Sequence, residues 1–322
     1  MEFKLINYCE IDAQASKSYS VIHNVDESLN LGDICGVDIE SLPTNITLIT
    51  HGSPCTSFSQ AGLQLGGDRG SGTPSSLMWN SVEIIKHCKP KFVIWENVAN
   101  VLSPKHKHNF DEYISELDSL WKDEQCDGYK SYYAVLNAKE FNTPQNRSRI
   151  FVVSIRKDID KHSGMDFIFP NPIEMTVTLR DVLEKDSDRF KYLTEAQINR
   201  IHTTTYASGR RRIQYKDWCD TLCARDGKDP KCVEDEKGIR HLTTKEYWRI
   251  MGFSDEDYQK AEDLGLSNFA LYKQAGNSIA LNVITEILRN IKNQYGEAFS
   301  KDCSYLSLFS GVGAFEMALK KI

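Results

Sequence analysis

The sequence predicts an α/β protein built on a mostly parallel sheet, and three observations lead to this prediction. Short apolar runs alternate with helix-like segments through residues 3–155, which is typical of strands joined by crossover helices. The chain closes with an apolar run, the glycine turn "SGVG" and a helical stretch (305–322), an arrangement that opens nucleotide-like cofactor sites. Polar side chains follow several of the runs, at strand ends where such folds place their sites.

Hydrophobic periodicity places each element along the chain. Strands are predicted where apolar residues run together between polar turns, at 3–9, 46–50, 91–95, 132–136, 149–155 and 305–309. Helices are predicted at 12–23, 75–88, 109–121 and 278–295. The first helix is expected to begin at Asp12.

The two ends of the chain read as one continuous unit. Residues 305–322 followed by residues 1–10 give strand, glycine turn, helix, strand and acid. An acidic residue closing the second strand is where such folds often bind a ribose hydroxyl, and Glu10 occupies that place. The sequence therefore looks circularly permuted, with strand 305–309 expected in the same sheet as strand 3–9.

The composition changes after "FPNP" at 169–172. Residues from about 185 to 240 are polar, charged and weakly periodic, and a regular pattern resumes at 243–253. We therefore predict a discontinuous catalytic domain of residues 1–172 plus 265–322, and a smaller domain of residues 173–264.

The overall composition is that of an ordinary soluble protein. Hydrophobic residues make up 40% of the 322 residues and charged residues 26%. No apolar run approaches the roughly 20 residues needed to span a bilayer. The N-terminal segment lacks the apolar core of a signal peptide, so a cytoplasmic protein is expected.

The cysteines and the charge distribution bear on metal binding and on nucleic-acid binding. The nine cysteines favour reduced thiols, and the spacing of Cys219, Cys223, Cys232 and His241 matches no common zinc pattern, so no metal is expected. The net charge of −6 argues against nucleic-acid binding through overall charge. A local stretch at 199–216 nevertheless holds basic residues and no acid, namely Arg200, Arg210, Arg211, Arg212 and Lys216.

Three strand ends carry groups suited to chemistry. Cys55 follows strand 46–50 in "HGSPCTSFSQAG" (51–62), as a nucleophile or as an inert core thiol. Glu96 follows strand 91–95, as a chemically employed carboxylate or as a buried helix cap. Gln145, Arg147 and Arg149 alternate into strand 149–155, where alternation sends both arginines the same way, toward a site or into a surface ion-pair network.

These groups stand among eight motifs that together resemble the C5-cytosine DNA methyltransferases. The motifs are "LFSGVGAFE" (308–316), "CEID" (9–12), "LGDI" (31–34), "GSPCTSFSQAG" (52–62), "ENV" (96–98), "PQNRSRIFVV" (144–153), "RHLTTKEYWRIMGF" (240–253) and "QAGNSIALNV" (274–283). Their order is unusual, because the "GNS" motif precedes the "FSGVG" motif here. A second departure is Thr56, where the family usually has glutamine after its catalytic cysteine.

The resemblance implies a Rossmann-like, circularly permuted methyltransferase that uses S-adenosylmethionine without a metal. It implies catalytic roles for Cys55, Glu96, Arg147 and Arg149. It implies that the cofactor is bound by Phe309, Ser310, Gly311, Gly313, Glu10, Ile11, Asp33, Ile34, Pro54, Leu77, Asn277 and Ser278. Contacts to double-stranded DNA are expected from Gln145, Arg210, Arg211 and Arg212, with residues of about 187–240 as the target-recognition region around a flipped-out cytosine.

We therefore expect a bacterial or phage DNA (cytosine-5-)-methyltransferase in a restriction-modification or phage-protection role. It would act as a cytoplasmic, nucleoid-associated monomer, with a cognate restriction endonuclease as a candidate partner. One alternative is a tRNA cytosine-5 methyltransferase of the same superfamily. The other is a catalytically inactive DNA-binding regulator, against which the intact Cys55, Glu96 and Arg149 argue.

Overall fold

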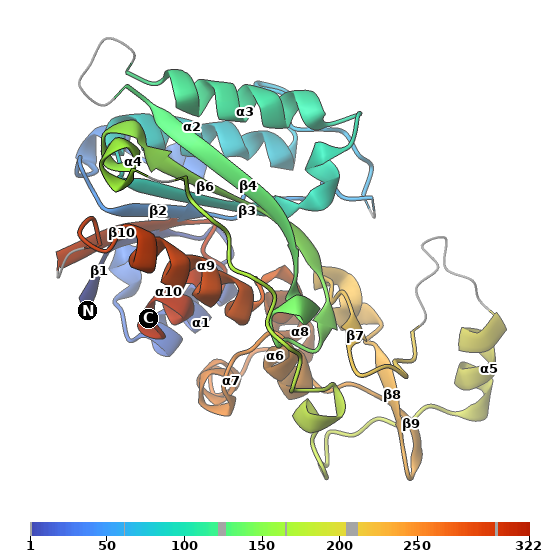
Figure 1. The fold of residues 1–322 in the computed structure, drawn as a ribbon. Helices are drawn as coiled ribbons and strands as arrows, with labels where there is room; N and C mark the ends of the chain where they lie inside the picture. The colour runs from blue at the N-terminus through green and yellow to red at the C-terminus, as the bar shows by residue number, and fades with distance from the viewer. Residues whose placement is uncertain (1, 61, 122–126, 165, 204–211, 300–301) are drawn as a thin grey trace.

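The computed structural model describes residues 2–60, 62–121, 127–164, 166–203, 212–299 and 302–322 (Figure 1). Its strands are β1 (Glu2–Cys9), β2 (Leu48–His51), β3 (Phe92–Val98), β4 (Tyr129–Asn137), β5 (Gln145–Asn146), β6 (Ser148–Arg156), β7 (Cys219–Asp220), β8 (Cys232–Asp235), β9 (Gly238–His241) and β10 (Asp302–Leu308). Its α-helices are α1 (Ala13–His23), α2 (Met78–Cys88), α3 (Lys107–Ser119), α4 (Lys157–Ser163), α5 (Glu195–Thr203), α6 (Thr244–Ile250), α7 (Asp255–Glu262), α8 (Asn268–Asn277), α9 (Leu281–Gln294) and α10 (Ala314–Lys320).

Six of these strands form one sheet in the order β1-β10-β2-β3-β6-β4. The pairs from β1 to β3 are parallel, whereas β6 runs antiparallel to both of its neighbours, β3 and β4. Within the described strands of this sheet, β6 alone is reversed. The prediction of an α/β fold with a mostly parallel sheet is confirmed.

The last strand of the chain lies inside this sheet. β10 pairs with β1 on one side and with β2 on the other, so that Tyr305 lies opposite both Leu5 and Leu48. This pairing confirms that strand 305–309 joins the sheet beside strand 3–9. That the motif order reflects a circular permutation stays a prediction.

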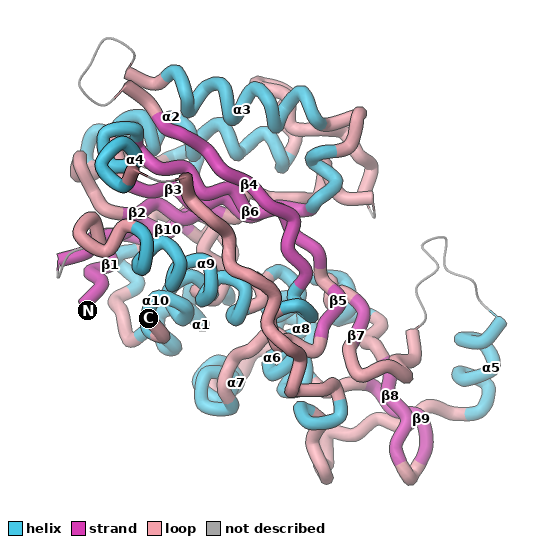
Figure 2. The backbone as a smooth tube through the Cα atoms, viewed as in Figure 1, coloured by secondary structure: helices cyan, strands magenta, loops and turns pink. Residues whose placement is uncertain are grey.

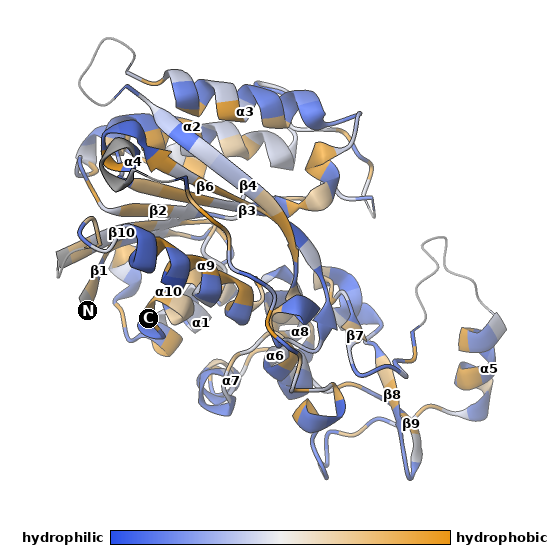
Figure 3. Cartoon of the chain, viewed as in Figure 1, coloured by the Kyte–Doolittle hydropathy of each residue, from blue (hydrophilic) through white to orange (hydrophobic). Residues whose placement is uncertain are grey.

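Helices cover both faces of the sheet (Figures 1 and 2). Helices α2 and α3 pack on one face, and α1, α9 and α10 pack on the other. In β3, Val93 and Trp95 belong to the apolar core under α2 and α3, whereas Phe92 and Ile94 belong to the core shared with α9 and α10. Burial of both faces explains why the central strands read as continuous apolar runs, as Figure 3 shows.

The segment predicted as a smaller domain consists of short elements. Within it β8 pairs with β9 as a hairpin, and β7 pairs in parallel with β5, which lies before this segment in the chain. Leu179, Leu242 and Trp248 lie in the same apolar cluster as Phe92 and Ile94 of the sheet, so the core continues from the sheet into this segment. The predicted division into two domains stays a prediction. None of the helices in the described ranges is long and apolar enough to cross a membrane.

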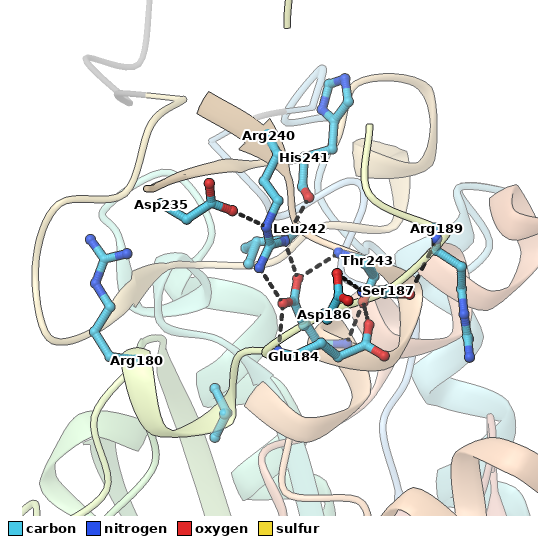
Figure 4. A network of polar contacts seen from close by, with 12 residues as sticks. Arg180, Glu184, Asp186, Ser187, Arg189, Asp235, Arg240, His241, Leu242 and Thr243 are labelled. Carbon is cyan, nitrogen blue, oxygen red and sulfur yellow. Dashed lines mark hydrogen bonds and ion pairs between the residues drawn. The ribbon is translucent and has the colours of Figure 1, made fainter. Parts of the chain in front are cut away.

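A buried ion pair lies at the start of residues 243–253, where the regular hydrophobic pattern resumes. The guanidinium of Arg240, 1% exposed, donates to Glu246 at 2.8 and 2.9 Å. It also donates to Asp235 at 2.9 Å (Figure 4). Glu246 also caps α6, because its carboxylate accepts from the Thr243 amide while the Thr243 hydroxyl accepts from the Glu246 amide. Two carboxylates therefore surround the buried arginine, and one of them, Glu246, also starts the helix, which fixes β9 against α6.

Candidate active site

Cys55 lies in the loop that leaves the carboxyl end of β2. Its side chain is half-buried, and its carbonyl accepts hydrogen bonds from the amides of Phe58 and Ser59 at 3.0 and 2.8 Å. Burial raises the pKa of the Cys55 thiol, while the positive charges of Arg149 and Arg147 oppose this shift and the charge of Glu96 adds to it. Since all three charges act on one thiol, the four predicted catalytic residues lie near one another.

Two residues that the sequence reading did not single out as site residues hold this loop in place. The Ser75 hydroxyl donates to the Pro54 carbonyl at 2.7 Å and accepts from the Ser57 amide at 3.1 Å, so it grips the chain on both sides of Cys55. The Asn97 amide donates to the Ser53 carbonyl at 3.1 Å. Asn97 could have been suspected from its place in "ENV", but no local signal marks Ser75.

Glu96 and Arg149 form a largely buried ion pair. Arg149 Nε lies 3.0 Å from Glu96 Oε1, with the two side chains 15% and 11% exposed. Burial raises the pKa of Glu96, and the neighbouring Arg149 and Arg147 charges counteract it. Glu96 lies within β3, so it is not a helix cap, and the burial of Arg149 excludes a surface ion-pair network.

Arg147 is oriented differently from its neighbour two residues on. Its guanidinium donates to the carbonyls of Leu222 at 2.9 Å, Ser278 at 2.8 Å and Gly276 at 3.3 Å. Burial lowers the pKa of Arg147, and Arg149 lowers it further. The two arginines therefore have different partners: Arg149 meets the carboxylate of Glu96, and Arg147 holds backbone.

Gln145 lies in the interior of the protein, and its assignment as a DNA contact stays a prediction. The side chain is fully buried, accepts from the Leu222 amide at 3.0 Å and donates to the Met251 sulfur at 3.0 Å. Both the oxygen and the nitrogen of its side-chain amide therefore have partners within the protein. The pairing of β5 with β7 places the residue in the interior. In this structure Gln145 ties β5 to Leu222 and Met251.

The glycine turn after β10 forms one wall of a pocket beside Glu96. Its lining includes Gly52, Glu96, Asn277, Ser278, Phe309, Ser310 and Gly311. Phe309 and Gly311 have φ values of 55° and 56°, and a Cβ on Gly311 would meet no atom within 4 Å, so the turn leaves space on that side. The buried Ser278 hydroxyl has no partner among the described residues.

The other predicted cofactor residues line the neighbouring strand ends. Glu10 follows β1, and its carboxylate accepts from the amides of Gly311 and Asp12, each at 2.8 Å, while burial raises its pKa. Asp33 caps the turn that contains the buried Ile34. Ile11 is 72% exposed, Leu77 packs at the edge of the core under α2, and Pro54 belongs to the Cys55 loop. At Gly313 a Cβ would approach His23 to 2.0 Å, so only glycine fits.

The predicted arginine cluster is only partly described. Arg210 and Arg211 lie outside the described residues, and their DNA contacts stay a prediction. Arg212 is described, and its guanidinium pairs with Asp229 and donates to the Pro230 carbonyl at 3.2 Å. Arg212 is thus anchored within the protein and is 16% exposed.

Another cationic surface lies near the catalytic edge. The ammonium groups of Lys139 and Lys216 lie 5.2 and 5.3 Å from the centre of the Trp218 ring, and Tyr215 beside them is 51% exposed. We call these four residues the Lys–Trp patch. It adjoins β7, whose partner β5 leads directly into the strand of Arg149.

Metal ligands do not gather in the described part of the chain. No group of three histidine, cysteine or acidic side chains that could hold a metal ion occurs there. Cys232 Sγ lies 3.5 Å from His241 Nδ1, a contact that needs no metal.

Comparison with known proteins identifies the family and the fold of the chain. A family model described as "C-5 cytosine-specific DNA methylase" matches residues 1–293. The type II methyltransferase M2.ScrFI of Lactococcus lactis subsp. cremoris is 34% identical over 81% of this chain and 71% of that protein. M.Bsp6I of Bacillus sp. (strain RFL6), another type II methyltransferase, is 33% identical over 88% of this chain and 89% of that protein. The solved structure of the Entamoeba histolytica methyltransferase EhMeth shares the fold, with a TM-score of 0.64, 15% identity and 89% of each chain covered.

Proposed function

The chain belongs to the C-5 cytosine-specific DNA methylase family and is a DNA (cytosine-5-)-methyltransferase, and on this premise we propose how its residues perform the reaction. The observation that carries the proposal is the proximity of three side chains. Cys55, Glu96 and Arg149 lie together at the carboxyl edge of the sheet, and Glu96 also lines the pocket of the glycine turn. A base held against these three groups would therefore lie next to the methyl donor.

The pocket residues fit S-adenosylmethionine, the cofactor that the family uses. The orphan hydroxyl of Ser278 and the open side of Gly311 leave a hydrogen-bonding group and space for it. We assign its adenosine to the ends of β1 and β10, where the Glu10 carboxylate would exchange its bond to the Gly311 amide for ribose hydroxyls. When bound, S-adenosylmethionine supplies an electrophilic methyl group.

Cys55, Glu96 and Arg149 divide the activation of cytosine among them. The Cys55 thiolate forms a bond to carbon 6, and the ring electrons move toward carbon 5. We assign Glu96 to donate a proton to N3 and Arg149 to bind O2, so that charge does not accumulate on the ring; burial raises the pKa of Glu96 and so favours its protonated form, against the pull of the neighbouring arginines. After carbon 5 has been alkylated, a base removes the proton of carbon 5, the Cys55 thiolate leaves, and N3 returns its proton to Glu96.

Two further proposals concern how cytosine reaches the site and where the protein acts. Cytosine in a duplex is shielded by stacking, so we propose that it is flipped out to reach Cys55. We further propose a monomer in the cytoplasm of a bacterial or phage-infected cell, associated with the nucleoid, in a restriction-modification or phage-protection role with a cognate endonuclease as candidate partner. The type II relatives do not favour the tRNA alternative.

Bisulfite sequencing tests the proposed function. DNA from cells that express the protein is expected to carry protected cytosines within one sequence, because methylation at carbon 5 blocks bisulfite deamination. DNA from cells with the empty vector is the control. Uniformly unprotected DNA from cells with ample folded protein would contradict the proposed function.

We propose the Lys–Trp patch as a DNA contact surface. Among the described residues neither Lys139 nor Lys216 has a carboxylate partner, so both charges are available to phosphates. Lys139→Ala and Lys216→Ala are each expected to weaken DNA binding and to lower the slope of log affinity against log salt by about 0.9. Fluorescence anisotropy at several salt concentrations measures both quantities.

Lys86→Ala is the matched control for this prediction. Lys86 is exposed in the last turn of α2, a helix that packs on one face of the sheet. Its removal is expected to leave the salt slope unchanged. Equal slopes for the Lys139, Lys216 and Lys86 variants would show that the patch does not touch DNA.

A further inference from the structure

Arg147 joins two parts of the molecule that serve different ligands. On one side it donates to the carbonyl of Leu222, which lies within the predicted recognition region of about residues 187–240. On the other side it donates to the carbonyls of Gly276 and Ser278, which flank and line the cofactor pocket. The side chain is 4% exposed, so it is enclosed by the parts that it connects.

Further contacts restrict the movement of residues 221–223, which we call the recognition segment, relative to β5 and residues 276–278. The Leu222 amide donates to Gln145 at 3.0 Å, and the Thr221 hydroxyl donates to the Asn146 carbonyl at 2.7 Å. A Cβ on Gly276 would lie 2.3 Å from the carbonyl carbon of Cys223, so the two backbones touch and no side chain fits between them. A shift of residues 221–223 must therefore displace Arg147 or the backbone of residues 276–278.

Arg147 also lies close to the reacting groups without facing them as Arg149 does. Its charge acts on Glu96 and on Cys55, but its donors at hydrogen-bonding distance all reach backbone carbonyls. Both ends of the guanidinium fork, Nη1 and Nη2, are held on backbone carbonyls, while the buried Nε has no partner among the described residues. The contacts therefore suit a positioning role better than direct action on cytosine.

We propose that Arg147 is the positioning residue through which DNA binding at the recognition segment and cofactor binding at residues 276–278 strengthen each other. The proposal rests on the proposed function, since it takes DNA and S-adenosylmethionine as the two ligands. DNA that holds residues 221–223 in place holds Arg147 and thereby the pocket wall. By linkage, the cofactor must then raise DNA affinity by the same factor.

The test measures this factor with the unreactive product S-adenosylhomocysteine and a duplex that contains the methylated sequence. Calorimetry gives the affinity for S-adenosylhomocysteine with and without the duplex, and anisotropy gives the reverse. The parent protein is expected to show equal factors in both directions, about 5–150-fold. Arg147→Lys keeps the charge but lacks the planar fork that reaches several carbonyls, so its factor is expected to fall toward one.

Arg240→Lys is the matched control, because Arg240 is an equally enclosed arginine without contact to the pocket. Both variants are expected to melt at a lower temperature, whereas only Arg147→Lys loses the coupling and shows a KM for the cofactor that no longer depends on DNA. Full coupling in folded Arg147→Lys, or equal loss in both variants, would overturn the proposal.

Hydrogen exchange on the unaltered protein gives a second measurement that needs no variant. Addition of S-adenosylhomocysteine alone is expected to slow exchange of the amides of residues 219–223. Unchanged exchange there, with the ligand bound, would overturn the link. A parent protein that methylates DNA but lacks any coupling would also overturn it, while leaving the proposed function intact.

Discussion

Cys55→Ser is expected to abolish methylation while leaving cofactor binding unchanged. A serine hydroxyl ionises far less readily than a thiol and is a weaker nucleophile toward carbon 6, so we expect a loss on the order of 10⁴-fold or more in kcat. The substitution is nearly isosteric, and the loop is held by Ser75 and Asn97 through the backbone of its neighbours. The loss should therefore report chemistry and not folding.

Trapping on modified DNA measures the same residue directly. DNA with 5-fluorocytosine at the target is expected to form a covalent adduct with the parent protein, because no proton can leave carbon 5 and the thiol cannot be released. Cys35→Ser, which alters an exposed thiol, should form the adduct normally. An adduct or normal turnover with Cys55→Ser would contradict the assignment of the nucleophile.

Glu96→Gln is expected to lower kcat by roughly 10²–10⁴-fold. The glutamine amide can donate a hydrogen bond to N3 but cannot transfer a proton, so charge builds on the ring as Cys55 adds. Binding of DNA and cofactor should change little, because glutamine keeps the shape of the side chain. Single-turnover rates at saturating DNA separate the chemical step from binding.

The pH profile distinguishes this role from a merely structural one. In the parent, Cys55 must lose a proton and Glu96 must keep one, and burial raises the pKa of both groups. The rate should therefore rise with pH as the thiol ionises and fall once Glu96 can no longer be protonated, which gives a maximum. Glu96→Gln should show only the rise, since its amide does not ionise. A falling limb that persists in this variant would assign it to another group.

The sequence by itself determined the sheet and the chemistry at its edge. The central strands read as unbroken apolar runs because both of their faces are buried, and Cys55 and Glu96 were predictable because each follows such a run. The place of residues 305–308 beside β1 was predictable because the ends of the chain complete one strand–turn–helix–strand unit. The apolar runs and the polar residues that follow them are contiguous in the sequence, so local pattern is enough to find them.

The partners of the remaining site residues were decided only by the tertiary structure. Alternation suggested that Arg147 and Arg149 point the same way, but β6 begins at Ser148, so Arg147 precedes the strand and turns to Leu222 and Ser278. Gln145 was expected at DNA, yet the pairing of β5 with β7 buries it. Local pattern encodes burial and element type, whereas a polar side chain finds its partner among segments some 75 to 130 residues away. Which of those segments meet depends on how the whole chain packs.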